Sequence, residues 1–176
     1  MKILAFAASN SQKSINKELV TYASTLIQGA EVEILDLNDY ELPLYGVYNE
    51  AKLGIPELAE KFFNKITQCN AIIISFAEHN GNYTVAYKNI FDWCSRINQK
   101  VFQDKAMVLL ATSPGPGGAK SVLRLAVNSS PYFGADLRGS MSLPSFYDNF
   151  DLEKKKLKDE ALNKELIEVV NTLIDY

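Results

Sequence analysis

Apolar and polar positions divide the chain into two kinds of segment. Three short runs are almost continuously apolar, as parallel strands covered on both faces are: residues 3–8, 71–77 and 106–112. The run 32–37 alternates apolar and acidic residues, which is typical of a half-exposed strand near a sheet edge. Residues 137–143 form a weaker fifth candidate. The pattern therefore predicts five strands.

Between and after these runs, apolar residues recur with the period of an α-helix. The predicted helices are residues 16–27, 56–66, 87–97, 118–127 and one long C-terminal helix, 152–174. Strands that alternate with helices in this way predict a parallel sheet with helices on both faces, joined by right-handed crossovers. The irregular piece 38–55 carries Tyr40, Tyr45 and Tyr48. It either covers a ligand or a partner subunit, or it packs on its own helix.

Length and composition narrow the class of protein. A chain of 176 residues with 47% apolar and 22% charged residues suits one globular domain, 1–176. The net charge of −3 argues against a nucleic-acid binder. Cys69 and Cys94 have no Cys or His at metal-ligand spacing, so we expect buried, reduced thiols and no metal. No leader-like or membrane-spanning stretch is recognisable, and we expect a soluble cytoplasmic protein.

Three loops are candidates for a ligand site, because open α/β sheets bind ligands beyond the carboxyl ends of their strands. These loops are residues 9–16, 78–84 and 113–118. The first holds three serines and two asparagines and leads into a helix, whose free N–H groups suit a phosphate. Simple helix capping by Ser14 or Asn16 is the alternative. Neither a Walker A motif nor G-x-G-x-x-G occurs, which argues against nucleotide hydrolysis and tight NAD binding.

The other two loops suit a flat ring. With strand order 2-1-3-4-5, all three loops border one crevice. Glycines let the backbone approach a ring closely, and the loops also offer polar and stacking side chains; these residues are Gly81, Gly115, Gly117, Glu78, Asn80 and His79. The sole histidine, His79, is interpreted as a ring contact rather than as an acid or base. Flavin mononucleotide (FMN) is a flat, phosphate-bearing ligand of this kind.

At these loops the sequence resembles the NADPH-dependent FMN reductase family, flavodoxin-like enzymes that include quinone, azo-dye and chromate reductases. Residues 9–16 are similar to the family pattern G-S-x-R-x-x-S-x-N. Residues 78–81 and 88–93 are similar to P-E-Y-N-G-S-x-x-x-x-L-K-N-x-x-D-W, and residues 113–119 are similar to its S-P-G-rich turn. The resemblance spans essentially residues 1–130.

The resemblance implies a three-layer α/β sandwich and an FMN-dependent oxidoreductase. NADPH or NADH would donate hydride to the flavin, which would then reduce a small acceptor such as a quinone, free flavin or azo compound. No catalytic side chain need be named, because the cofactor carries the chemistry. Members usually form homodimers or homotetramers, and the helix with Asp92 and Trp93 is a candidate interface, although core packing explains Trp93 equally well. The implied cofactor-binding residues are Ser9, Ser11, Lys13, Ser14, Ile15, Asn16, Glu78, His79, Asn80, Gly81, Ser113, Pro114, Gly115 and Gly117.

The sequence also departs from the family pattern. Ala8 replaces a glycine, Ser11 replaces the arginine and His79 replaces a tyrosine, so positive charge near the phosphate depends on Lys13. These changes affect the preference for NADPH more than they affect flavin binding. Two other functions share the topology: a flavodoxin-type electron carrier and a non-enzymatic binding domain. The small net charge and the lack of an acidic cluster around the loops argue against the carrier.

Overall fold

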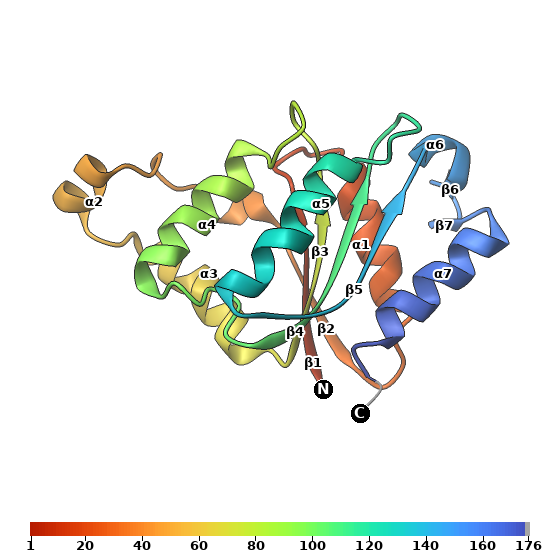
Figure 1. The fold of residues 1–176 in the computed structure, drawn as a ribbon, viewed down its shortest axis with the longest axis horizontal. Helices are drawn as coiled ribbons and strands as arrows, with labels where there is room; N and C mark the ends of the chain where they lie inside the picture. The colour runs from red at the N-terminus through yellow and green to blue at the C-terminus, as the bar shows by residue number, and fades with distance from the viewer. Residues whose placement is uncertain (175–176) are drawn as a thin grey trace.

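A parallel sheet forms the centre of the molecule in the computed structural model, which describes residues 1–174. Within these residues the main sheet has five strands in the order β2-β1-β3-β4-β5, the order expected from the sequence (Figure 1). The strands are β1 Lys2–Ala8, β2 Glu31–Leu35, β3 Ala71–Phe76, β4 Lys105–Thr112 and β5 Ala135–Leu143. The strands β1 and β3 pair directly, with Phe6 opposite Ile74. Their carboxyl ends therefore lie side by side.

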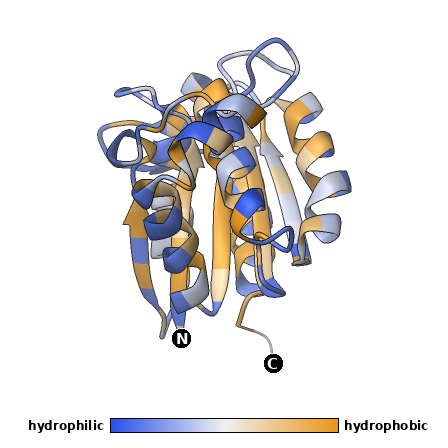
Figure 2. Ribbon diagram, turned by 90° about the vertical axis from the view of Figure 1, so that its left-hand side faces the viewer, coloured by the Kyte–Doolittle hydropathy of each residue, from blue (hydrophilic) through white to orange (hydrophobic). Residues whose placement is uncertain are grey.

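Helices cover both faces of this sheet. Alternate residues of β1 point to opposite sides: Leu4 and Phe6 belong to one apolar core, Ile3 and Ala5 to the other. The first core is closed by α3 Glu57–Gln68, α4 Val85–Ile97 and α5 Lys120–Ser129, the second by α1 Ile15–Thr25 and α7 Glu160–Asn171. Figure 2 shows mostly apolar strands between helices in which apolar and polar residues are mixed. The three-layer flavodoxin-like sandwich is confirmed.

The chain after β5 differs from the sequence-based prediction of one long helix over 152–174. It forms α6 Phe146–Asn149, a two-stranded hairpin of β6 Phe150–Asp151 and β7 Lys156–Leu157, and only then α7. The Asp151 carboxylate accepts hydrogen bonds from the backbone N–H groups of Glu153 and Lys154. These local bonds fold the lysine run into a turn, because side-chain caps compete with helix formation.

The irregular piece 38–55 contains a projecting arm. It begins near the short 3-10 helix η1 Leu37–Asp39 and carries α2 Val47–Leu53, which extends to the left in Figure 1 and buries none of its residues. Hydrogen bonds fasten the arm to α4, and its Tyr40 ring also packs edge to face on Phe62 of α3, the helix that follows it. The Asn89 amide donates to the carbonyl oxygens of Leu42 and Pro43 and accepts from the Tyr45 N–H. The Trp93 indole N–H also donates to the Pro43 carbonyl at 2.7 Å.

Within residues 1–174, no helix is long and apolar enough to cross a bilayer. The same residues hold no cluster of His, Cys, Asp and Glu that could bind a metal ion. Cys69 and Cys94 are free and buried, as expected.

Candidate functional site

A crevice of about 210 Å³ opens where β1, β3 and β4 end. It brings together ten of the residues predicted from the sequence: Ser9, Ser11, Lys13, Ser14, Ile15, Asn16, Glu78, His79, Ser113 and Pro114. The predicted residues Asn80, Gly81, Gly115 and Gly117 belong to the same loops but do not line it. Three wall residues were not predicted: Ala77, Thr112 and Tyr147. The crevice lies at the edge of the sheet where such folds bind ligands.

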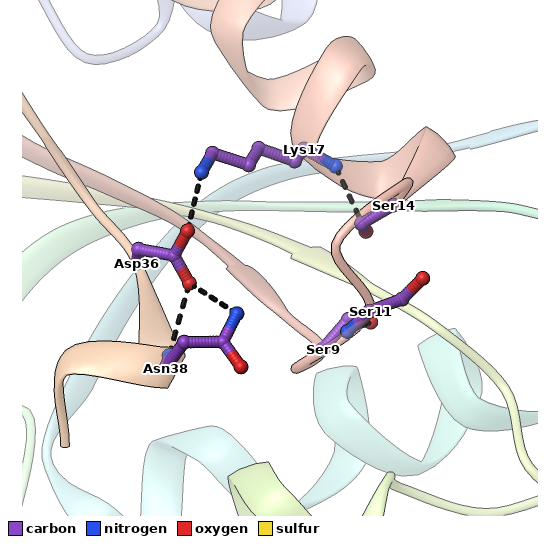
Figure 3. Close-up of polar contacts among 6 residues, drawn as sticks. All are labelled: Ser9, Ser11, Ser14, Lys17, Asp36 and Asn38. Carbon is purple, nitrogen blue, oxygen red and sulfur yellow. Dashed lines mark hydrogen bonds and ion pairs between the residues drawn. The ribbon is translucent and has the colours of Figure 1, made fainter. Parts of the chain in front are cut away.

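The first loop presents hydrogen-bond donors at the start of α1. Ser14 is the N-cap of this helix, and its Oγ accepts from the Lys17 N–H at 3.2 Å (Figure 3). The capping alternative is therefore correct for Ser14, but capping uses only one of the free N–H groups. Among residues 1–174 no acceptor is bound by the backbone N–H groups of Ile15 and Asn16. Because a hydroxyl can accept and donate at once, Ser14 also keeps its own O–H for an anion.

The Asn16 side chain is turned into the protein and is only 2% exposed. Its Oδ1 accepts from the Ser75 hydroxyl at 2.8 Å and from the Thr112 N–H at 3.1 Å. Its Nδ2 donates to the Thr112 carbonyl at 3.1 Å. This amide therefore connects the start of α1 to β3 and β4, and only its backbone N–H is available to a ligand.

Two lysines near the first loop differ in their partners. Lys17 extends from α1 to Asp36, and this hydrogen bond, with a second from the Asn38 N–H, holds the pKa of the Asp36 carboxyl below its usual value (Figure 3). Lys13 lines the crevice and forms no ion pair within the described part of the chain. Lys13 is therefore the cation that stays available to an anionic ligand.

The second loop is a tight hairpin whose conformation accounts for two predicted residues. His79 and Asn82 exchange backbone hydrogen bonds of 3.0 and 3.1 Å, and Asn80 and Gly81 between them have φ of 52° and 76°. Two positive φ angles define a type I′ turn, for which Asn-Gly is a preferred pair. The Asn-Gly dipeptide was thus a signal for this turn, which the sequence-based interpretation assigned to ligand contact alone.

Glu78 connects the second loop to the third. Its Oε2 accepts from the Val122 N–H at 2.9 Å, in the first turn of α5. A carboxylate at a helix N-terminus satisfies a free donor and interacts favourably with the helix dipole. The side chain that was expected at a polar ligand edge therefore holds α5, and with it the third loop, in place beside the crevice.

The third loop is supported from α6. The carbonyl oxygens of Ser113 and Gly115 accept from the N–H groups of Phe146 and Ser145 at 3.0 and 2.9 Å. This attachment brings Tyr147 to the wall of the crevice. No local sequence signal identified Tyr147, because its segment is attached through Ser145 and Phe146, which follow their partners Gly115 and Ser113 by 30 and 33 positions.

Glycine is required by the protein at one position of the third loop. Gly118 has a φ of 59°, and a Cβ there would lie 2.4 Å from the Ser142 Oγ and 3.1 Å from the Pro144 backbone. At Gly115 and Gly117 a Cβ would meet no atom within 4 Å. The protein's own packing therefore does not explain the glycines at 115 and 117, whereas a closely approaching ligand would.

A second cavity, of about 440 Å³, adjoins the crevice at His79, which lines both. Its walls come from the segment after β2, including Tyr40 and Leu42, from Asn10 in the first loop, and from Ile90 in α4. The sole histidine thus stands between the crevice and a larger cavity.

A three-layer sandwich with this strand order and a crevice at its switch point defines the flavodoxin-like class of fold. Residues 1–143 match the family model of NADPH-dependent FMN reductase, and the chain belongs to that family. Membership confirms the expectation of a flavin-dependent oxidoreductase that uses a reduced nicotinamide. In fold, the chain is similar to FerB, a flavoenzyme NAD(P)H:(acceptor) oxidoreductase from Paracoccus denitrificans. The TM-score is 0.78 at 24% identity, over 99% of this chain and 96% of FerB.

Relatives in sequence include named reductases. An NAD(P)H-dependent FMN reductase of Pseudomonas aeruginosa is 30% identical over 121 residues, 67% of this chain and 63% of its own length. An NADPH:quinone oxidoreductase of Arabidopsis thaliana is 28% identical over 129 residues, 71% of this chain and 64% of its own length. An uncharacterized protein of Mycoplasma pneumoniae is 27% identical over 157 residues, 86% of this chain and 92% of its own length. The matched region thus spans just under two thirds of each named reductase.

Proposed function

We propose that this chain holds one FMN in the crevice and works as an NAD(P)H-dependent oxidoreductase that reduces a small acceptor such as a quinone. The proposal treats residues 1–176 as a single FMN-binding domain. The observation that carries it is a set of N–H groups at the start of α1 that bond no acceptor among the described residues. They lie beside Lys13, which pairs with no described acid, in a chain of the FMN reductase family.

The first loop would hold the phosphate. Each hydrogen bond to a charged group contributes about 1.5 to 3 kcal/mol, whereas the helix dipole contributes about 0.3 to 2 kcal/mol. Donors from Ser11, Lys13, Ser14 and Ile15 therefore outweigh the dipole. The buried Ser9 accepts from the Ser11 N–H at 3.2 Å and shapes the turn. We assign Asn16 a positioning role through Ser75 and Thr112.

The second and third loops would hold the ring. Bound FMN supplies the redox chemistry, because it accepts hydride from a reduced nicotinamide and passes the electrons to an acceptor. The protein orients it: Glu78 fixes the two loops relative to each other, and His79 and Pro114 offer flat surfaces on the crevice wall. Backbone N–H groups of these loops would stabilise negative charge at the ring edge. The cavity beyond His79 leaves room for the donor or the acceptor.

The test is flavin binding followed by turnover. Purified protein is mixed with FMN and desalted, its absorption spectrum is recorded, and oxidation of NADH and of NADPH is followed with a quinone present. We expect a yellow protein and acceptor-dependent oxidation. A yellow protein without oxidation of either nicotinamide would indicate an electron carrier, and a colourless protein would indicate a non-enzymatic domain; either result contradicts the proposal.

A charge variant tests the position of the phosphate. Ser11 is exposed, so Ser11→Glu leaves the fold intact but places a negative charge in the first loop. We expect its dissociation constant for FMN to rise at least about tenfold, the equivalent of about 1.4 kcal/mol. The matched control is Ser140→Glu, at an exposed serine of β5 outside the crevice. Equal affinities of the two variants would show that the phosphate lies elsewhere.

We also propose that copies of the chain associate as a homodimer or homotetramer. The support is the arm at α2, where Leu44, Val47 and Tyr48 are 67%, 78% and 80% exposed. Adjacent exposed apolar side chains are typical of interaction surfaces. Sedimentation velocity is expected to show an oligomer that Val47→Lys dissociates. A wild-type chain that stays monomeric at high micromolar concentration would contradict this.

A further inference from the structure

A separate hollow of about 250 Å³ lies between α4 and α5, which run side by side over the same face of the sheet (Figure 1). Six aromatic rings form most of its wall: Phe76, Tyr83, Tyr87, Phe91, Phe102 and Phe133. They contact one another, for example Phe91 with Phe133 at 4.7 Å between ring centroids and Phe76 with Tyr87 at 5.3 Å. No residue of this wall lines the FMN crevice.

One polar atom of the hollow lacks a partner. Ser130 lines it, is only 4% exposed, and its Oγ forms no hydrogen bond with any described residue. The neighbouring hydroxyls are satisfied, since the Ser129 Oγ donates to the Leu125 carbonyl at 2.8 Å and lies 3.1 Å from the Tyr83 hydroxyl. A buried hydroxyl without a partner is unfavourable and calls for an explanation. A ligand oxygen in the hollow would supply the missing hydrogen bond.

The charges at the hollow balance each other. Lys88 and Asp92, both on α4, form an ion pair at 2.7 Å, and they are the charged residues of the wall. An occupant therefore needs no net charge. An apolar cavity of about 150 Å³ holds a single benzene ring, so the larger volume here suits two fused rings. Aromatic walls favour an aromatic occupant through stacked and edge-to-face contacts.

We propose that this hollow is a second ligand site, which binds a small, neutral, two-ring aromatic compound whose oxygen pairs with the Ser130 hydroxyl. The site is independent of FMN binding. The two sites nevertheless share one segment, because Phe76 and Tyr83 face the hollow while Ala77, Glu78 and His79 line the crevice.

The probe is 1-naphthol, with naphthalene as the analogue that lacks the hydroxyl. Full-length protein, with and without FMN, is titrated with each compound by isothermal calorimetry. We expect one 1-naphthol site per chain, with the same affinity in both forms of the protein. Absence of 1-naphthol binding up to its solubility limit, or its displacement by FMN, would overturn the proposal.

Two variants locate the probe. Ser130→Ala is expected to weaken 1-naphthol about three- to tenfold, as loss of one neutral hydrogen bond does, and to leave naphthalene unchanged. Its urea midpoint should not fall, because the hydroxyl has no hydrogen-bond partner among residues 1–174. Leu125→Trp, at a wall residue that is 37% exposed, should block both compounds, whereas the control Leu152→Trp, at a residue 48% exposed elsewhere, should block neither.

A second copy of the chain is the competing occupant. If the chain associates through this face, the affinity for 1-naphthol will fall as protein concentration rises. That result, or binding that is indifferent to both Ser130→Ala and Leu125→Trp, would overturn the assignment.

Discussion

Substitution of Asn16 is the strongest test of how hydrogen bonds hold the walls of the crevice together. The three hydrogen bonds of the Asn16 amide join residues that are 96 and 59 positions apart in the chain, and all of them are buried. Asn16→Ala removes these bonds. The Thr112 backbone groups and the Ser75 hydroxyl then lose these partners while they stay buried from solvent. We therefore expect Asn16→Ala to lower the free energy of unfolding far more than the substitution of a surface residue does.

The magnitude follows from the hydrogen bonds. Each intramolecular bond contributes about 0.5 to 1.5 kcal/mol net, and each stranded buried group costs about 1 to 3 kcal/mol. Partial relaxation and entry of water bring the expected loss for Asn16→Ala to about 2 to 5 kcal/mol, near the top of the range for single substitutions. By comparison, loss of the Ser14 cap in Ser14→Ala should cost about 1 kcal/mol.

Urea unfolding of the FMN-free protein, followed by circular dichroism, measures this loss. Asn128 on α5 is exposed, and Asn128→Ala is the matched control, expected within about 0.5 kcal/mol of wild type. Asn16→Asp keeps one acceptor oxygen but turns the other toward the Thr112 carbonyl, so it should be at least as damaging as alanine. A loss below about 1 kcal/mol for Asn16→Ala would refute the bracing role.

Three further outcomes are expected. Lys13→Gln should weaken FMN binding severalfold at low salt and much less in 1 M NaCl, because the lost contact is a screened charge pair; flavin fluorescence at both salt concentrations measures it. Burial raises the pKa of the Cys94 thiol to about 12 and also raises that of Cys69, so Ellman's reagent at pH 8 should label both thiols only after unfolding. The folded pKa of Asp36 is lowered, so its stabilising contribution is present above the unfolded pKa and is lost as pH falls. Asp36→Asn should therefore flatten the decline in stability below about pH 4 by at most about 1 kcal/mol, the scale of an exposed pair.

Sequence patterns predicted the sheet because strands that are buried on both faces need apolar residues at almost every position. The strands β1, β3 and β4 are therefore recognisable as continuous apolar runs. The chain after β5 was predicted wrongly, since the turn at Asp151 depends on side-chain bonds to the backbone that leave no apolar period. The sequence predicted most of the residues that line the crevice, but it did not predict the contacts that each side chain makes there. Which group Asn16 or Glu78 bonds is decided by partners 96 and 44 positions away, and Tyr147 reaches the crevice only through α6.

The three loops of the crevice are fixed by the protein itself. The Thr84 hydroxyl donates to the Ala8 carbonyl at 3.0 Å, Asn16 bonds to Ser75 and Thr112, and Glu78 accepts from Val122. These bonds connect β1 to α4, α1 to β3 and β4, and the second loop to α5. Donors that are already held in place lose little entropy when a ligand binds. In the proposed binding mode the phosphate and the ring of FMN contact loops that are held at a set separation. Damage to any one connection should therefore weaken FMN binding even where no group touching the flavin is changed.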